Sequence, residues 1–147
     1  MNSVSIENLA KEDLEKYQEA LKDIKLYEER IDLIMTKLSI SSSWNDEIKV
    51  QTSPRPDSRD ELFDELFRKQ KELRTHQIAA IQKMNDIEDK INKIGEPVYK
   101  RILKRKYISN QTLDRICEEE HYTRRWIGEL HRRALLEYGK ILKKNSS

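Results

Sequence analysis

The fold is decided by residues 6–38, which read IENLAKEDLEKYQEALKDIKLYEERIDLIMTKL. Apolar side chains recur there at alternating steps of three and four residues, with Glu28 as the one polar interruption. This heptad repeat predicts a single amphipathic helix of about 33 residues, roughly 50 Å long. The predicted seam consists of Leu14, Tyr17, Leu21, Ile24, Ile31, Met35 and Leu38.

A second heptad repeat covers residues 59–94, and Gly95 with Pro97 is expected to end its helix. Its seam consists of Phe63, Leu66, Leu73, Ala80, Met84, Ile87, Ile91 and Ile94, interrupted by Gln70 and Gln77. Residues 39–58 are rich in Ser, Pro and Asp, which predicts a long surface loop. Residues 1–95 should therefore form an antiparallel helical hairpin. Because a two-helix hairpin leaves apolar flank exposed, we expect a homo-oligomer, with a dimer favoured.

The composition favours the same all-α fold. The 147 residues include only three glycines and three prolines, too few for the turns of a sandwich, a barrel or a doubly wound sheet. No run of about 18 apolar residues predicts a membrane span, and the first residues lack the pattern of a signal peptide. One cysteine excludes an internal disulfide framework and suits a reducing compartment. We expect a soluble intracellular protein.

The charges are distributed unevenly along the chain. Residues 99–147 contain 13 Lys and Arg against 6 Asp and Glu, a net charge of +7. The first 98 residues contain the remaining 16 Lys and Arg against 21 Asp and Glu, a net charge of −5. An acidic body with a basic end is typical of a protein that binds nucleic acid.

The basic end, residues 96–147, is predicted to be a small separate domain of short helices. Its first helix should bury Val98, Ile102, Leu103 and Tyr107. Thr112 and Thr123 are each suited to cap the N-terminus of a following helix. The spacing of the last two helices is that of a helix-turn-helix, with His121 in the turn where glycine is common. Its expected core positions are Ile116, Cys117, Tyr122, Ile127 and Leu130.

The last helix is expected to have two distinct faces. One face is apolar and consists of Ile127, Leu130, Ala134, Tyr138 and Ile141; the opposite face consists of Arg124, Arg125, Gly128, Glu129 and Arg132. A helix start with two arginines suits the major groove, because arginine can donate two hydrogen bonds to guanine and glutamate can accept one from cytosine. Gly128 would let the backbone approach DNA or would ease packing.

The stretch TLDRICEEEHYTRRWIGELHRRALLEY, residues 112–138, resembles region 4 of bacterial sigma factors. The whole chain is similar in layout to the RinA- and ArpU-type late-gene transcriptional regulators of Gram-positive phages. The resemblance implies promoter DNA as a partner, host RNA polymerase as a second candidate partner, and the cytoplasm of a bacterial host cell as the location. It implies that Arg124, Arg125, Trp126 and Glu129 read bases. For Trp126, packing on the flank of the domain is preferred over contact with a thymine methyl group.

Contacts with DNA phosphates would give binding affinity and make that affinity depend on salt, but they would give little sequence specificity. The residues predicted to make them are Lys100, Arg101, Lys104, Arg105, Lys106, Arg115, Thr123 and Arg132. The alternative is that these basic residues bind no phosphate and simply form a solvated helix face. Glu118, Glu119 and Glu120 would repel DNA, so they should face away from it, as a solvated helix end or as a polymerase contact.

An enzyme is not expected, because the sequence has no nucleotide-binding loop and no paired nucleophile and base. No cofactor or metal is expected either, since Cys117, His121 and His131 have irregular spacing for a zinc site. The leading hypothesis is a sequence-specific transcriptional regulator that activates late phage genes. One alternative is a DNA-packaging protein like a small terminase subunit, although those commonly carry the DNA-binding unit first. The other is a coiled-coil adaptor that does not bind DNA.

Overall fold

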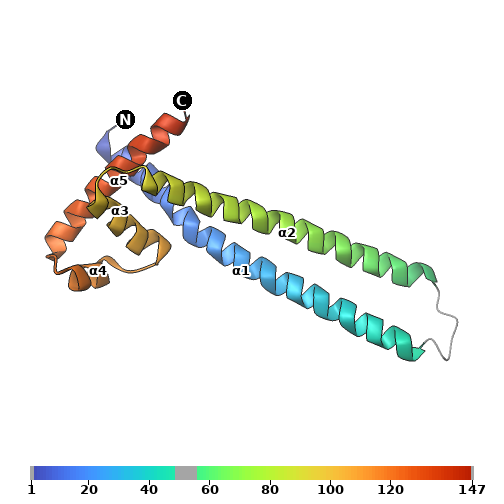
Figure 1. The fold of residues 1–147 in the computed structure, drawn as a ribbon. Helices are drawn as coiled ribbons and strands as arrows, with labels where there is room; N and C mark the ends of the chain where they lie inside the picture. The colour runs from blue at the N-terminus through green and yellow to red at the C-terminus, as the bar shows by residue number, and fades with distance from the viewer. Residues whose placement is uncertain (1, 49–55, 147) are drawn as a thin grey trace. The chain divides into compact units, whose positions relative to one another are not determined.

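The computed structural model describes residues 2–48 and 56–146, without the side chains of residues 38, 40–48, 56–60, 62 and 146. All regular structure in these residues is helical, which confirms the predicted all-α class (Figure 1). The elements are α1 (Ser3–Ile48), α2 (Pro56–Asn92), α3 (Pro97–Leu103), the π-helical turn η1 (Lys104–Ile108), α4 (Leu113–Glu120) and α5 (Arg124–Ser146). None of the described helices is long and apolar enough to cross a bilayer.

The two long helices extend further than the sequence predicts. The loop expected over residues 39–58 is wrong at both ends, because α1 continues to Ile48 and α2 begins at Pro56; its central part, residues 49–55, lies outside the described residues. Serine lowers helix stability by only a few tenths of a kcal/mol, so a short serine run does not end a helix. Proline, by contrast, is well suited to the first position of a helix, where its missing N–H is not needed.

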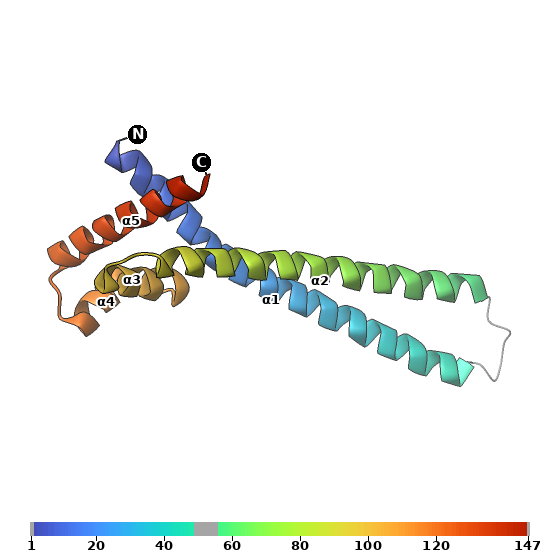
Figure 2. The same ribbon diagram turned by 45° about the horizontal axis from the view of Figure 1, so that its top comes forward.

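The chain divides into two compact units, and the division does not follow the predicted boundary at residue 95. Unit 1 consists of Met1–Leu21 and Gln82–Ser147, and unit 2 consists of Lys22–Ile81. The beginning of α1 and the end of α2 thus share a unit with α3, α4 and α5 (Figure 2). The basic end of the chain is therefore packed on part of the long helices rather than forming a compact unit by itself.

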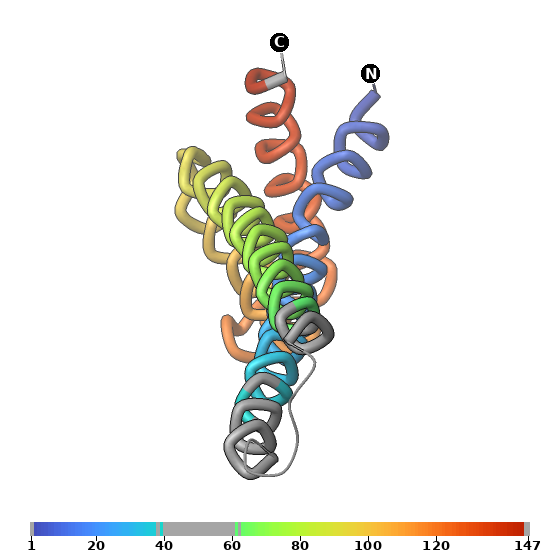
Figure 3. The backbone as a smooth tube through the Cα atoms, turned by 90° about the vertical axis from the view of Figure 1, so that its right-hand side faces the viewer, coloured from blue at the N-terminus to red at the C-terminus, as the bar shows by residue number. Residues whose placement is uncertain are grey.

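The main core of unit 1 draws apolar side chains from four helices and η1. It contains Ala10, Leu14, Tyr17, Ile87, Ile91, Ile94, Leu103, Tyr107, Ala134, Leu135 and Tyr138. The helices α1 and α5 approach closely at Gly139, where an added Cβ would lie 2.3 Å from Cγ2 of Ile6 (Figure 3). Only a residue without a side chain fits this crossing.

Within unit 2, α1 and α2 run antiparallel. The rings of Tyr27 and His76 stack with centroids 5.6 Å apart, while Gln70 donates a hydrogen bond to the sulfur of Met35 at 3.2 Å. The core of this unit consists of Ile31, Ile34 and Leu73, with Tyr27, Phe63 and Leu66 packed against it.

The predicted seam of α2 is confirmed, because none of its apolar positions is exposed. The predicted seam of α1 is wrong at Met35, which is 49% exposed, while Ile34 is only 8% exposed. The first heptads of α1 pack against both α2 and α5, whereas the described core residues of α1 in unit 2 pack against α2. A seam continued from the first heptads therefore falls on Met35, one residue after the position that is actually buried. The side chain of Leu38, the last seam position, lies outside the described ones.

Candidate nucleic-acid interface

Helices α4 and α5 are joined by a short turn that the local sequence explains. Thr112 caps α4 by accepting a hydrogen bond from the N–H of Arg115 at 3.1 Å, and Thr123 caps α5 in the same way for Trp126 at 3.1 Å. His121 ends α4 in the left-handed conformation, with φ 60° and ψ 40°. Histidine therefore occupies a conformation for which glycine is the usual residue.

The five residues predicted as the core of this region lie in one cluster. Ile102 of α3 packs with Ile116, Cys117, Ile127 and Leu130, and Tyr122 lies against them. Cys117 and Ile127 are thus in the same buried cluster, as their ten-residue spacing predicted. The cluster fixes α5 against α4 and α3, and it leaves the first turn of α5 at the surface.

A hollow of about 470 Å³ lies at the first turns of α5 and is lined by Thr123, Arg125, Trp126 and Glu129. Three of the four predicted base-reading residues are therefore brought together. Arg125 is exposed and has no hydrogen bond or ion pair with any residue that the structure describes. Its guanidinium is therefore available to a ligand at this helix start.

Arg124, the fourth predicted base reader, has a different environment. Its Nε and Nη2 donate to the two carboxylate oxygens of Asp114 in α4, at 2.9 and 2.6 Å. The hydrogen bond and the charge of Asp114 raise the pKa of Arg124 above its usual value. The two adjacent arginines are thus not equivalent, since a carboxylate holds Arg124 while Arg125 has no such partner among the described residues.

Trp126 lies on the exposed surface of α5. Its side chain is 42% exposed and belongs to none of the buried clusters. The guanidinium of Arg133, about two helical turns further along α5, lies 5.2 Å from the ring centroid. This cation–π contact holds the indole against its own helix, with the remaining surface facing the hollow.

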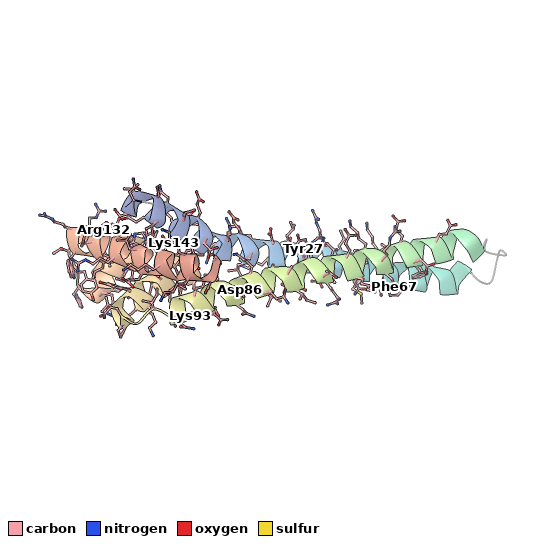
Figure 4. The ribbon with its side chains drawn as sticks, turned by 90° about the horizontal axis from the view of Figure 1, so that it is seen from above. Tyr27, Phe67, Asp86, Lys93, Arg132 and Lys143 are labelled. Atoms are coloured by element: carbon pink, nitrogen blue, oxygen red, sulfur yellow. The ribbon has the colours of Figure 1, made fainter. Side chains whose placement is uncertain are left out.

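Glu129 is paired with two arginines of α5. Its carboxylate accepts from Arg132 at 2.6 Å and from Arg133 at 3.0 Å, and these hydrogen bonds lower the pKa of Glu129 to about 2. Glu129 is therefore ionised at neutral pH and can act only as a hydrogen-bond acceptor. Arg132, labelled on α5 in Figure 4, also lies 3.8 Å from Glu7.

Six of the eight residues predicted to contact phosphate fall into two groups, while Thr123 caps α5 and Arg132 is paired with Glu129. Arg101, Arg105 and Arg115 are engaged by the acidic end of α4: Arg101 lies 3.1 Å from Glu120, Arg105 pairs with both Glu119 and Glu120, and Arg115 lies 2.8 Å from Glu119. The side chain of Arg105 is only 19% exposed. The sequence interpretation expected these glutamates only to face away from DNA and did not predict the pairs.

The lysines form the second group. Lys104 is exposed and Lys100 is half-buried, and neither forms an ion pair with a described residue. Lys106 lies 5.6 Å from the ring centroid of Tyr107. Gly128 faces open space, with no atom within 4 Å of an added Cβ, so the suggestion that it eases packing is wrong. Its surface is accessible to a ligand.

One buried and one half-buried polar group of unit 1 have roles that were not predicted from the sequence. Asp13 is 7% exposed and accepts hydrogen bonds from Tyr138 at 2.6 Å, Lys83 at 3.1 Å and Lys90 at 3.3 Å. The sequence did contain a sign that Asp13 is buried, because Asp13 lies on the apolar stripe of α1 between Ala10 and Leu14. The other group is His131, whose Nε2 lies 2.8 Å from the hydroxyl of Tyr107.

Comparison with known protein families assigns this chain to a family. A protein-family profile described as "Protein of unknown function (DUF1492)" matches residues 37–138, more than half of the chain. The chain belongs to this family. The match extends through α2, α3 and α4 and ends within α5 at Tyr138. Searches of curated proteins and of solved structures found no match.

Proposed function

We propose that this member of the DUF1492 family is a sequence-specific DNA-binding transcriptional regulator. The observation that carries the proposal is the first turns of α5, where the available Arg125 lies beside Trp126 and Glu129 around one exposed hollow. A guanidinium, an aromatic edge and a carboxylate are the groups that recognise guanine, a thymine methyl group and cytosine in the major groove.

The proposal treats α4 and α5 as a helix-turn-helix with α5 as the recognition helix. In that motif, residues at the N-terminal end of the second helix contact base edges while the first helix crosses the backbone. Arg125 would be the principal base reader. Arg124 is assigned no DNA contact, because two hydrogen bonds pair it with the carboxylate of Asp114.

Phosphate binding is assigned to the lysines rather than to the arginines of the same region. Lys104 and Lys100 have no competing carboxylate among the described residues. Arg101, Arg105 and Arg115 are already neutralised by Glu119 and Glu120, and breaking those pairs would oppose any gain from DNA. Their role in the proposal is to hold α3, η1 and α4 together.

The biological setting follows from the resemblance to sigma region 4 and to RinA- and ArpU-type regulators. It supports a phage-encoded activator of late genes that acts at promoters in the bacterial host cytoplasm, with host RNA polymerase as a candidate partner. The test is selection of bound duplexes from a random-sequence pool by the full chain. We expect a short enriched motif that contains guanine; recovery of unenriched sequences would contradict sequence-specific binding.

A further inference from the structure

Unit 2 contains a groove that the proposed DNA contacts do not use. It has a volume of about 580 Å³ and lies between α1 and α2, within a single unit. Its apolar lining consists of Leu33, Ile34, Leu66 and Leu73. Leu33 is 56% exposed, so part of this lining faces solvent. Exposed apolar side chains that are rimmed by charged residues mark sites of interaction with other molecules.

The face of α1 beside this groove alternates apolar and basic side chains. Leu26, Arg30, Leu33 and Lys37 follow one another at steps of four, three and four residues, so they lie in one row along the helix. All four are exposed, and Leu26 extends the row one helical turn beyond the groove. The side chains of Arg30 and Lys37 form no hydrogen bond or ion pair with a described residue. The row thus offers both apolar contact and positive charge to a partner.

The groove concentrates positive charge that the rest of unit 2 lacks. Residues 22–81 contain 11 Lys and Arg against 12 Asp and Glu, a net charge of −1. The lining alone has a net charge of +2, since its charged residues are Arg30, Lys37, Arg68, Lys69, Glu65 and Glu72. Lys69 lies 4.0 Å from Glu72 on its own helix, whereas none of the other three cations forms an ion pair with a described residue. The groove is therefore complementary to a partner that carries negative charge.

The lining also indicates the form of that partner. The groove lies between two helices, which satisfy their backbone hydrogen bonds internally, so it has no open strand edge for an extended peptide. The described residues that line it include no aromatic side chain, which a proline-rich segment would need. Nucleic acid is disfavoured, because its phosphates would meet the carboxylates of Glu65 and Glu72 and would leave the leucines uncovered. An amphipathic helix can cover the leucines with its apolar face and reach the cations with carboxylates.

We propose that the groove of unit 2 binds an acidic amphipathic helix of another protein. Apolar and carboxylate side chains alternate in that helix at steps of three and four residues, which matches the row on α1. The apolar side chains pack on Leu33 and Leu66, and the carboxylates pair with Arg30, Lys37 and Arg68. The row rises by about 10 Å from Arg30 to Lys37, so about three turns of the partner helix cover the groove. This inference does not rest on the proposed binding of DNA.

The first experiment determines the pattern that the groove selects. The full chain is used to select phage-displayed helical peptides of about four turns. One row of the peptide, at steps of three and four residues, is varied among Leu, Glu, Lys and Ser, with Ala elsewhere. We expect enrichment of Leu alternating with Glu. Enrichment of Lys, or no enrichment above the starting pool, would overturn the proposal.

The second experiment locates the bound peptide by charge reversal. The enriched peptide is labelled and titrated against Arg30→Glu with Lys37→Glu, in the groove, and against Lys71→Glu with Arg74→Glu, which makes the same change of net charge on exposed residues outside it. Binding should weaken about tenfold or more for the groove variant, because two attractions become repulsions, and by less than about twofold for the control. Equal losses for the two variants would show that the peptide does not bind in the groove.

The apolar contact is tested with a second matched pair. Leu33→Gln lies in the groove, and Ile78→Gln lies outside it at the same exposed fraction, 56%. Only Leu33→Gln should weaken binding of the peptide, by about threefold to tenfold, because it removes apolar area that the peptide covers. Both variants should keep the helical circular dichroism of wild type, since both sites are exposed. Unchanged affinity for Leu33→Gln would contradict the proposal.

Two further measurements separate this partner from the other candidate occupants. The two charge-reversal variants should bind a scrambled DNA duplex with equal affinity, and Leu33→Gln should have the same mass as wild type by light scattering. A loss of DNA affinity in the groove variant alone would assign the groove to nucleic acid. A wild-type dimer that Leu33→Gln dissociates would assign it to a second copy of the chain. Either result would overturn the proposal.

Discussion

At the scale of single residues, the least expected feature is a charged carboxylate inside the core of unit 1. Burial alone would raise the pKa of Asp13, but the hydrogen bonds from Tyr138 and Lys83 and the charges of Lys90 and Lys83 hold it below its usual value. Asp13 therefore stays ionised and links α1, α2 and α5. A buried carboxylate in such a network is costly to disrupt, because its partners lose their acceptor.

Removing the hydroxyl of Tyr138 should therefore weaken the fold. We expect Tyr138→Phe to lower the free energy of unfolding by about 1.5–3 kcal/mol, the range for a hydrogen bond to a charged group. The measurement is urea denaturation followed by circular dichroism. Tyr27→Phe is the control, since the Tyr27 hydroxyl has no hydrogen bond with a described residue, and it should be close to neutral. Equal effects of the two substitutions would exclude a stabilising role for the Asp13–Tyr138 bond.

His131 makes the stability of the fold depend on pH. Burial, followed by the charges of Lys106 and Lys11, lowers the pKa of His131 to about 4. An unfolded histidine has a pKa near 6.5, so between about pH 4 and 6.5 the unfolded chain binds a proton that the folded chain does not. The contribution is fully present above pH 6.5 and is lost as the pH falls through this window.

We expect the free energy of unfolding to fall by up to about 3 kcal/mol more in wild type than in His131→Gln between pH 7 and pH 4. Glutamine can still bond to the hydroxyl of Tyr107 but does not titrate. Parallel denaturation series across this pH range measure the difference. Identical pH profiles for the two proteins would mean that folding does not lower the pKa of His131.

At the scale of the elements, α5 contains two glycines with opposite roles. An alanine Cβ at Gly139 would meet Cγ2 of Ile6 at 2.3 Å and the Ile6 carbonyl oxygen at 3.2 Å, whereas at Gly128 it would meet nothing within 4 Å. Gly139→Ala should destabilise the chain by about 1–3 kcal/mol through overpacking. Gly128→Ala should stabilise it by up to about 1 kcal/mol, because alanine favours the helix.

Thermal unfolding of the two variants beside wild type checks this pair. The melting temperature should fall for Gly139→Ala and rise for Gly128→Ala. A rise in both would show that α1 and α5 do not cross closely at Gly139.

The extent to which these elements follow from sequence depends on the range of the interactions that fix them. Local signals predicted the caps at Thr112 and Thr123 and the core spacing from Cys117 to Ile127, because each depends on residues nearby in the chain. The end of α1 and the exposure of Met35 were not predictable in this way. They depend on which helices pack where, and the first heptads of α1 meet α5 more than 100 residues later in the chain.

The candidate interface was predictable in residue type but not in pairing. The sequence predicted the same base-reading role for Arg124 and Arg125, since both follow Thr123 on the polar face of α5. Only the position of Asp114 on α4 distinguishes them. Likewise, the acidic end of α4 was predicted to point away from DNA, and nothing local indicated that Glu119 and Glu120 would pair with Arg105 on η1.

At the scale of the whole molecule, the net charge of +7 after residue 98 overstates the cations available to DNA. Several arginines in this region are paired internally, and the phosphate contacts should come mainly from lysines. The dependence of affinity on salt reports how many phosphates the protein neutralises, and its slope changes by about one unit for each phosphate. Lys104→Ala should therefore lower both affinity and slope for every DNA sequence.

The most direct test of the central claim, that α5 reads bases through Arg125, is a binding titration at one fixed salt concentration. The selected duplex and a scrambled duplex are each titrated with wild type, Arg125→Ala and Lys104→Ala. We predict that Arg125→Ala loses about 1–3 kcal/mol of binding free energy on the selected duplex and much less on the scrambled one. Lys104→Ala should weaken both equally. Equal losses on the two duplexes for Arg125→Ala would contradict the account, because Arg125 would then contribute charge without sequence recognition.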